Sequence, residues 1–308
     1  MNLGELKQNV RAIAQDVSEY SYLWSDEEIV QYLNEGQVEA CRYAPWILKS
    51  SSLSLGETRS VSNITVFGTY GTIQSIKVGD TNILSNTVDY TTNDNTTAAL
   101  LANAINEAGY FEATVKNNVV SVYPLEGNGS YYNNMIPIIT STNSFTTVTA
   151  FAGGVDGICR IQLKPNVREY KFSQKLLKIE AMYLGDNQKK LCAVDFRDLR
   201  DNDKTLAKQK GEVEAILYGI GNDSFYVAKI PAVKDYINFT ACYMPLKTLR
   251  NNADTPEIPE QYHNKLIHYA LYKMYQKNDI EAEQFEISNF HFSKFIEEFG
   301  DNQFAAAS

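Results

Sequence analysis

The strongest constraint on the fold is a change in composition over residues 61–157. Lysine and arginine occur there only as Lys77 and Lys116, against seven acidic residues, and cysteine, histidine and tryptophan are absent. All of these residue types occur in the rest of the sequence: tryptophan before the stretch, histidine after it, and cysteine on both sides. Because the composition changes at both ends, we expect a small module inserted into a host domain that is formed by residues 1–59 and 158–308.

The inserted module is predicted to combine strands with one helix. Apolar and polar residues alternate with the period of a half-buried strand in four segments. These segments are Ile64–Phe67, Ile73–Val78, Ala113–Val115 and Val119–Tyr123. Lys116-Asn117-Asn118 favours a hairpin turn between the last two, and a helix is expected over residues 98–105, ending near Gly109. A later strand pair is expected at Ile136–Thr140 and Ser144–Ala150.

The amino-terminal block has the pattern of two helices. Apolar side chains recur there at steps of three and four residues, the period of one helix face. They are Leu3, Leu6, Val10, Ile13 and Val17. Ser25 and Glu28 have the spacing of a capping box that opens the second helix, and Pro45 ends it because proline cannot continue the helical hydrogen-bond pattern. We expect two short antiparallel helices joined by a tight loop.

The host domain resumes with strands after residue 157. The segments with a strand pattern are Ile158–Leu163, Leu176–Leu184, Val213–Tyr218, Phe225–Ile230 and Ile237–Tyr243. Gly219–Asp223 favours a hairpin turn between the third and the fourth. Residues 195–210 are polar and predict a short helix followed by a loop.

The carboxyl-terminal block is again helical. Pro259 suits the first helical position, and one face of the first helix consists of Tyr262, Leu266, Tyr269, Ala270 and Met274. The face of the second helix consists of Phe285, Phe292, Ile296 and Phe299, and this helix ends before Gly300. The patterns together predict an α+β fold: helical amino- and carboxyl-terminal segments pack with a mainly antiparallel sheet, and the small α+β module interrupts this host domain.

The charge and composition exclude several classes of protein. A formal net charge of −9 argues against a protein whose main task is to hold nucleic acid. It is compatible with a surface along which DNA slides without adhering. We expect no membrane span and no secretory signal, since no apolar run is long enough. The four cysteines lie far apart without a C-x-x-C pair, which is typical of reduced thiols.

No catalytic, cofactor-binding or metal site is predicted. The glycine motifs of phosphate sites, dinucleotide sites and nucleophile elbows are absent. His263 and His268 are five residues apart, about 140° around a helix, so we expect surface or interface histidines and no zinc pair. His291 has no cysteine or acidic residue near it in the sequence at a spacing that would indicate a metal or catalytic site. The acidic run from Asp195 to Asp203 is interleaved with basic residues and lacks the glycine of a calcium loop, which predicts a solvated, self-neutralised loop.

Three stretches occur in an order that is typical of one protein family. They are LWSDEEIVQYLNEG at 23–36, YKFSQKLLKI at 170–179 and PEIPEQYHNKLIHYAL at 256–271. A fourth stretch, FAGGVDG at 151–157, is similar to inserts of phage virion proteins. In this order the sequence resembles the head-to-tail connector, or adaptor, proteins of tailed bacteriophages, particularly of short-tailed phages. The middle stretch lacks the proline-containing form that is usual in this family.

The resemblance implies a structural virion protein that is not an enzyme. Members of the family form a homo-oligomeric ring, commonly a dodecamer, that joins the portal protein of the capsid to tail or nozzle proteins. The ring lines part of the channel through which genomic DNA passes. We therefore expect no cofactor, no membrane partner, assembly in the cytoplasm of the host bacterium, and a final location in the neck or tail of the virion.

The tyrosines near the carboxyl end are candidates for contacts in such a ring. Their spacing most simply predicts packing in the core and between helices, and a subunit interface is the alternative. The candidate portal or subunit interface consists of Tyr262, Tyr269, Tyr272, Tyr275 and Phe304. Two alternative functions are a tail completion or nozzle protein below the adaptor, and a virion-associated glycan hydrolase that uses carboxylates of residues 61–157.

Overall fold

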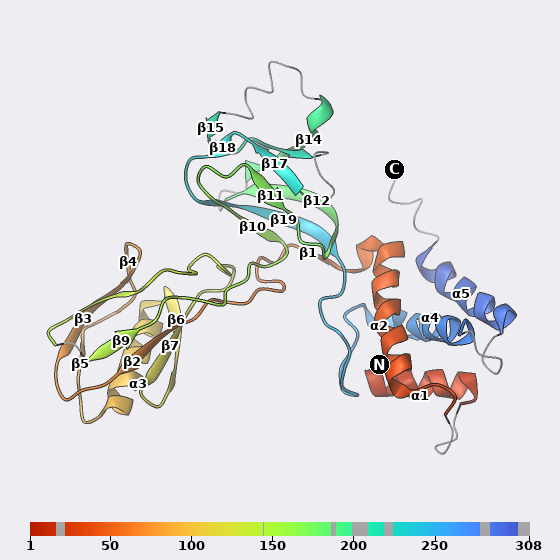
Figure 1. The fold of residues 1–308 in the computed structure, drawn as a ribbon, viewed down its shortest axis with the longest axis horizontal. Coiled ribbons are helices and arrows are strands. Elements are labelled where there is room, and N and C mark those ends of the chain that lie inside the picture. The colour runs from red at the N-terminus through yellow and green to blue at the C-terminus, as the bar shows by residue number, and fades with distance from the viewer. Residues whose placement is uncertain are drawn as a thin grey trace. The chain divides into compact units, whose positions relative to one another are not determined.

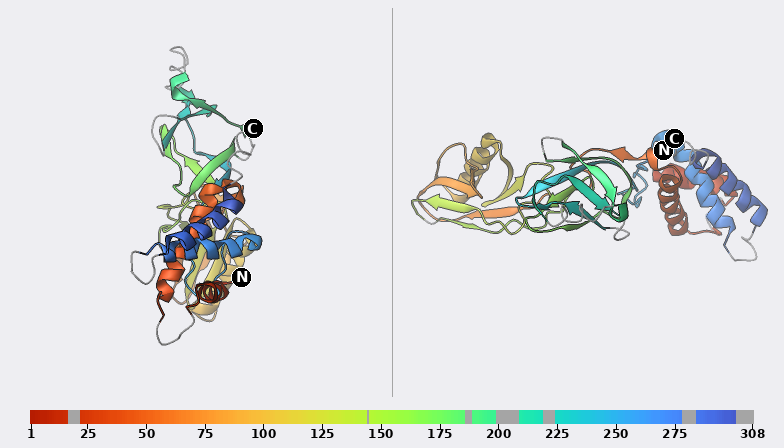
Figure 2. Two further views of the ribbon diagram at one scale, coloured as in Figure 1. Left: turned by 90° about the vertical axis from the view of Figure 1, so that its right-hand side faces the viewer. Right: turned by 90° about the horizontal axis from the view of Figure 1, so that it is seen from above.

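The computed structural model describes residues 1–16, 22–143, 145–185, 189–198, 209–218, 224–277 and 284–300. It confirms the predicted α+β fold (Figures 1 and 2). Along the sequence, helices lie near both ends of the chain, and most of the strands, which form several antiparallel sheets, come from the residues between these helices. The chain divides into two compact units. We call them the helical unit (Met1–Ser50, Ser173–Ala181 and Thr240–Ser308) and the strand-rich unit (Ser51–Phe172 and Met182–Phe239). The division into a host domain and an insert stays a prediction.

The described helices of the helical unit start in different ways, and a side-chain cap, from Asn2 and from Ser25, is present only on the first two. They are α1 (Leu3–Ala14), α2 (Asp26–Tyr43), η1 (Pro45–Ile47), η4 (Glu260–Tyr262), α4 (His263–Tyr275) and α5 (Phe285–Phe299). The Ser25 hydroxyl accepts from the Glu28 N–H and the Glu28 carboxylate accepts from the Ser25 N–H, which confirms the predicted capping box. Pro45 begins η1 directly after α2 has ended, as expected.

The buried side of α5 differs from the predicted face. Phe285, expected to face the core, is 61% exposed. Phe292 and Ile296 are only half-buried. The buried residues of α5 are Ser288, His291, Phe295 and Phe299. These recur at steps of three and four residues, so they form the buried face of the helix, and Phe285 lies in the first turn to one side of it.

A close approach between α2 and α4 depends on Gly36. A Cβ placed on this glycine would lie 3.2 Å from Tyr269 Cδ1 and 3.3 Å from Tyr269 Cβ. The missing side chain therefore lets the Tyr269 ring lie directly on the backbone of α2. All of the residues predicted for the face of α4 are buried, because this helix packs on α1, α2 and α5.

The strand-rich unit contains a hydrophobic core of its own within residues 64–151. Its elements are β2 (Ser62–Val66), β3 (Thr72–Val78), β4 (Thr81–Asn82), β5 (Val88–Asp89), α3 (Asp94–Ala108), β6 (Phe111–Lys116), β7 (Val119–Pro124), β8 (Ile138–Ser141) and β9 (Thr146–Val148). The strands form one sheet in the order β6-β7-β2-β9 and a second sheet in which β4, β5 and β8 pair with β3. Helix α3 packs against β2, β5, β6 and β7 (Figure 1). It ends at Gly109 in the left-handed conformation (φ 73°), as predicted.

The predicted pairing of the two last strands of this region is wrong. Both β8 and β9 exist, but β8 pairs with β3 and β9 pairs with β2. Strand alternation predicts which residues form a strand, whereas the partner depends on contacts far apart in the sequence. The hairpin between β6 and β7 forms as predicted, with Asn117 in the left-handed conformation (φ 56°).

Two side chains form hydrogen bonds with backbone groups that are not paired with a neighbouring strand. Strand β6 is an edge strand, and the Asn106 side chain both donates to the Ala113 carbonyl (3.0 Å) and accepts from the Ala113 N–H (2.7 Å). The Glu57 carboxylate accepts from the N–H groups of Gly127 and Gly129. Each contact satisfies polar backbone groups that would otherwise need water.

The remaining strands confirm most of the predicted segments. They are β1 (Lys49–Ser50), β10 (Arg160–Leu163), β11 (Glu169–Lys171), β12 (Leu176–Leu184), β13 (Lys189–Lys190), β14 (Cys192–Asp195), β15 (Lys210–Gly211), β16 (Ala215–Tyr218), β17 (Ser224–Ala228), β18 (Ile230–Pro231) and β19 (Asp235–Tyr243). One sheet has the order β1-β19-β12-β13 with β10 on β19, and another has the order β11-β17-β16-β14. The predicted hairpin is the antiparallel pair β16–β17. A short helix, η2 (Phe196–Asp198), follows β14, and the turn predicted at residues 219–223 lies outside the described residues.

We predict that Gly36→Leu destabilises the protein by about 1–3 kcal/mol, because a side chain at this position must displace the Tyr269 ring. Urea unfolding followed by circular dichroism measures this change. Ala12→Leu, on an exposed position of α1, is the matched control and should stay within about 0.5 kcal/mol of wild type. Equal stability of the two variants would contradict a tight crossing at Gly36.

Candidate functional site

The structure places four of the five predicted interface residues in α4 and the turn before it. Tyr262, Tyr269 and Tyr275 are buried within the helical unit, and Tyr272 is half-buried. Phe304 lies outside the described residues. Burial raises the pKa of the Tyr269 and Tyr275 hydroxyls, so both remain neutral. Their role in an interface stays a prediction.

The tyrosines of α4 join its neighbours through ring contacts. The Tyr269 ring packs on the Phe295 ring of α5 with centroids 5.0 Å apart. The Tyr275 ring meets the Trp24 ring edge to face at 5.7 Å. Through these rings α4 contacts both Trp24, which precedes α2, and Phe295 of α5. Helix α4 is therefore the central helix of this unit.

A pair of histidines lies between α4 and α5. His268 Nδ1 and His291 Nδ1 are 2.9 Å apart, and the two rings are stacked with centroids 5.2 Å apart. One Nδ1 must donate and the other must accept, so the two rings cannot both be cationic while this contact is kept. Burial, and then the neighbouring His268, lower the pKa of His291 to about 4. Sequence reasoning missed this pair because its members are 23 residues apart.

The third histidine is also buried, and it is not a surface residue. His263 is within hydrogen-bond distance of the Ile258 carbonyl (2.8 Å) and of the amino-terminal nitrogen (3.0 Å). Within the described part of the chain, no three histidine, cysteine, aspartate or glutamate residues are grouped so that they could hold a metal ion.

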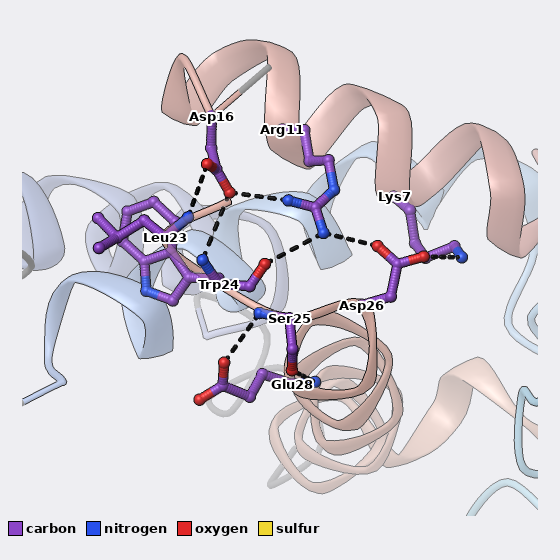
Figure 3. A network of polar contacts seen from close by, with 8 residues as sticks. All are labelled: Lys7, Arg11, Asp16, Leu23, Trp24, Ser25, Asp26 and Glu28. Carbon is purple, nitrogen blue, oxygen red and sulfur yellow. Dashed lines mark hydrogen bonds and ion pairs between the residues drawn. The ribbon is translucent and has the colours of Figure 1, made fainter. Parts of the chain in front are cut away.

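A polar network around Arg11 joins α1 to the start of α2 (Figure 3). The Arg11 guanidinium donates to Asp16 Oδ2 (2.7 Å), to the Trp24 carbonyl (3.1 Å) and to Asp26 Oδ1 (2.6 Å). Asp16 in turn accepts from the Leu23 N–H at 2.9 Å. Both Arg11 and Asp16 are buried, so each depends on the other for compensation of its charge. Sequence reasoning missed this network. The feature that could have indicated it is Arg11, a basic residue next to Val10 on the apolar face of the first helix.

The carboxylates at the start of α2 are held ionised by basic partners. The pKa of Asp26 lies below its usual value because Arg11 and Lys7 donate to it, the latter at 2.7 Å. The pKa of Glu28 is lowered in the same direction, first by Lys277, which donates to it at 2.7 Å. Negative charge at the amino end of a helix is also favoured by the helix dipole.

A groove of about 1000 Å³ runs along the outward side of α2. Lys7, the segment 248–250 and the α4 residues Tyr269 and Lys273 complete its walls. The groove contains charged residues of both signs, and Lys273 pairs with Glu35 at 3.5 Å. Its lining thus combines charged side chains such as Asp26 and Arg42 with apolar ones such as Val30.

The acidic loop contains one strong internal pair. The Arg197 side chain donates to both carboxylate oxygens of Asp195, through Nε at 3.1 Å and Nη2 at 2.8 Å, and the pKa of Asp195 falls to about 2. This pair agrees with the prediction of self-neutralisation. Residues 199–208 of the same run lie outside the described residues.

Comparison with known families identifies the chain. The family described as SU10 adaptor protein matches residues 149–306, which include α4, α5, β10 and β19. The chain belongs to the SU10 adaptor protein family. It is thus a phage adaptor-type protein, as the resemblance predicted. No curated protein matches the sequence. None of the described helices of the adaptor is long and apolar enough to span a membrane.

We predict that Arg11→Met destabilises the adaptor by about 3–5 kcal/mol, because it leaves the Asp16 carboxylate buried without a counter-charge. Arg11→Met/Asp16→Leu should recover part of this loss. Lys7→Met is the control, since its partner Asp26 is half-exposed and the loss should stay below about 1 kcal/mol. Urea unfolding of these three variants and of Asp16→Leu measures the differences, and additive effects of the two substitutions in the double variant would contradict coupling.

We predict that the adaptor loses stability as the pH falls from about 6.5 to about 4. Both histidines have lowered pKa values in the folded state, so the unfolded chain takes up protons first. His268 also faces Lys265, Lys294 and Glu297, and His291 faces the Tyr275 ring. Unfolding free energies measured across this range should fall for wild type and fall less for His291→Gln. Asp26 and Glu28 contribute only toward the acid end, because their pKa values are lowered from 3.8 and 4.5.

Proposed function

We propose that this adaptor is a structural virion protein that forms a dodecameric ring between the portal vertex and the tail of a short-tailed phage. The observation that carries the proposal is the family match over residues 149–306. The order of the sequence stretches that resemble connector proteins supports the same role. In this role the protein assembles in the bacterial cytoplasm and resides in the neck of the virion.

The charge of the chain supports a ring through which DNA passes. The formal net charge is −9, and the chain outside residues 61–157 also has an acidic excess, of four charges. Bound phosphates would retain the genome if basic residues lined the channel, whereas an acidic wall repels them. The ring therefore lines part of the channel without binding DNA specifically.

The helical unit supplies the contacts of the ring in this proposal. Its helices pack on one another through α4, and the groove along α2 leaves a long, partly charged surface beside them. The half-buried Tyr272 and the carboxyl-terminal Phe304 belong to the contact with the portal or with the next subunit. The module of residues 61–157, inserted into the host domain of residues 1–59 and 158–308, lies at the periphery of the ring.

The proposal includes no enzymatic activity and no cofactor. Among the described residues, the groups with shifted pKa values include a histidine pair between two helices, carboxylates held in ion pairs, and buried tyrosine and cysteine side chains. Each of them is explained by its contacts within the protein, which is the ordinary situation of a structural network.

Mixing the purified chain with the portal protein of its own phage tests this function. We expect a portal-bound ring of twelve copies in electron micrographs, and we expect light scattering to show a complex of matching mass. A chain that stays monomeric and leaves the portal unchanged would contradict the proposal. Binding only to tail or nozzle proteins would instead favour a tail completion protein.

A further inference from the structure

A pocket of about 470 Å³ lies within the strand-rich unit, where the segment after β7 meets β10 and the start of β19. Its lining combines three tyrosine rings with two basic residues, one carboxylate and one amide. The lining residues are Asn128, Tyr131, Tyr132, Arg160, Lys234, Asp235 and Tyr236. Aromatic rings with convergent polar groups are typical of sites for small ligands, and the proposed function uses none of these residues.

Strand pairing places the first cation of the pocket on a ring. Strands β10 and β19 are antiparallel, with Arg160 opposite Asn238 and Gln162 opposite Tyr236. Arg160 and Tyr236 are therefore diagonal neighbours on one face of this pair. The guanidinium carbon of Arg160 lies 3.5 Å from the centroid of the Tyr236 ring, which is a cation–π contact.

The second cation lies on a tyrosine of the segment after β7. Lys234 Nζ is 4.7 Å from the centroid of the Tyr131 ring, and this ring is 5.8 Å from that of Tyr236. Asp156 fixes the segment, because its carboxylate accepts a hydrogen bond from the Ser130 N–H at 2.8 Å. Contacts within the protein therefore hold the lining in place, as in sites that are formed before the ligand binds.

The two cations of the pocket lack carboxylate partners. Among the described residues, neither Arg160 nor Lys234 forms an ion pair. The Arg160 guanidinium donates through Nη1 to the Gly127 carbonyl, and no described residue accepts from its other amino group. The one carboxylate of the lining, Asp235, accepts the Tyr236 N–H at 2.8 Å. The lining thus has one more positive than negative charge, in a chain whose net charge is −9, and it attracts an anion.

The pocket also offers acceptors for hydroxyl groups. The Asn128 side-chain nitrogen donates to the Leu125 carbonyl at 2.9 Å, which leaves its amide oxygen available. Asp235 contacts the backbone through Oδ1, and its Oδ2 accepts no hydrogen bond from the described residues. A simple anion such as sulfate has no donor for these oxygens, and a neutral sugar has no charge for the cations. A sugar acid carries both a carboxylate and hydroxyl groups on one compact ring.

We propose that this pocket binds an acidic sugar, a uronate unit of a polysaccharide. Arg160 and Lys234 attract the carboxylate of the sugar, and Asn128 and Asp235 accept hydrogen bonds from its hydroxyl groups. The volume lies in the lower half of the range of about 300–1,000 Å³ that small ligands occupy, which suits one or two sugar units. The proposal goes beyond the adaptor role, since it gives the strand-rich unit a ligand of its own.

Isothermal titration calorimetry of the full-length chain with trigalacturonate tests the site. The fully methyl-esterified trisaccharide is the matched control, because it keeps every hydroxyl group and loses the negative charges. We expect the acid to bind at least about tenfold more tightly than the ester. Its affinity should also fall as NaCl is raised from about 0.05 M to about 0.5 M, since salt screens the charges. Both measurements use the wild-type chain, so they do not depend on the folding of a variant.

Substitutions of one exposed lysine locate the binding. Lys234→Gln removes a cation of the pocket and should raise the dissociation constant for trigalacturonate about fivefold. Lys234→Arg keeps the charge and should stay within about twofold of wild type. Lys116→Gln changes an exposed lysine of β6 in the same unit and should bind as wild type does. Thermal unfolding of the three variants should be close to that of wild type, because both lysines are exposed.

Four results would overturn the proposal. They are equal affinity for the acid and its ester, no binding of uronate trisaccharides of the galacturonate, glucuronate and mannuronate series, equal affinity of Lys234→Gln and wild type, and equally tight binding of a simpler or different anion. Inorganic phosphate that binds as tightly as trigalacturonate would show a general anion site, and a glutamate hexapeptide that does so would show a site for an acidic peptide. Each of these results leaves the adaptor role intact, because the titrations involve no portal protein.

Discussion

The helical unit depends on one buried charge interaction, between Arg11 and Asp16. This pair fixes the end of α1 against the turn that leads into α2, and the same guanidinium reaches Asp26 in the first turn of α2. A buried guanidinium is stable only where several acceptors surround it, so the path of the chain here is tightly specified. The direction of α2 follows from this junction.

The rest of the helical unit follows from the position of α2. Gly36 allows the Tyr269 ring to lie on the helix backbone, and this brings α4 into place. The opposite side of α4 then receives α5 through Phe295 and the histidine pair. Aromatic rings thus connect α2, α4 and α5, which is one use of the many tyrosines and phenylalanines of the chain.

Local chemistry in the sequence predicted much of this fold, whereas long-range partners could not be read from it. The Ser25 cap, the stop at Gly109 and the turn at Asn117 follow from neighbouring residues, and the structure confirms each of them. The partners of β8 and β9 were mispredicted because strand alternation carries no information about pairing. The Arg11 network and the His268–His291 pair were missed for a related reason: each joins segments whose proximity only the folded chain creates.

The Asn106 side chain has a consequence for any assembly of many copies. Strand β6 is an open edge, and unpaired peptide groups on such an edge are a template on which another strand can add. Asn106 already occupies the N–H and the carbonyl of Ala113, in the middle of that edge. Wherever two copies of the chain meet at this edge, the contact therefore hinders the addition of a strand that would begin an amyloid-like ribbon.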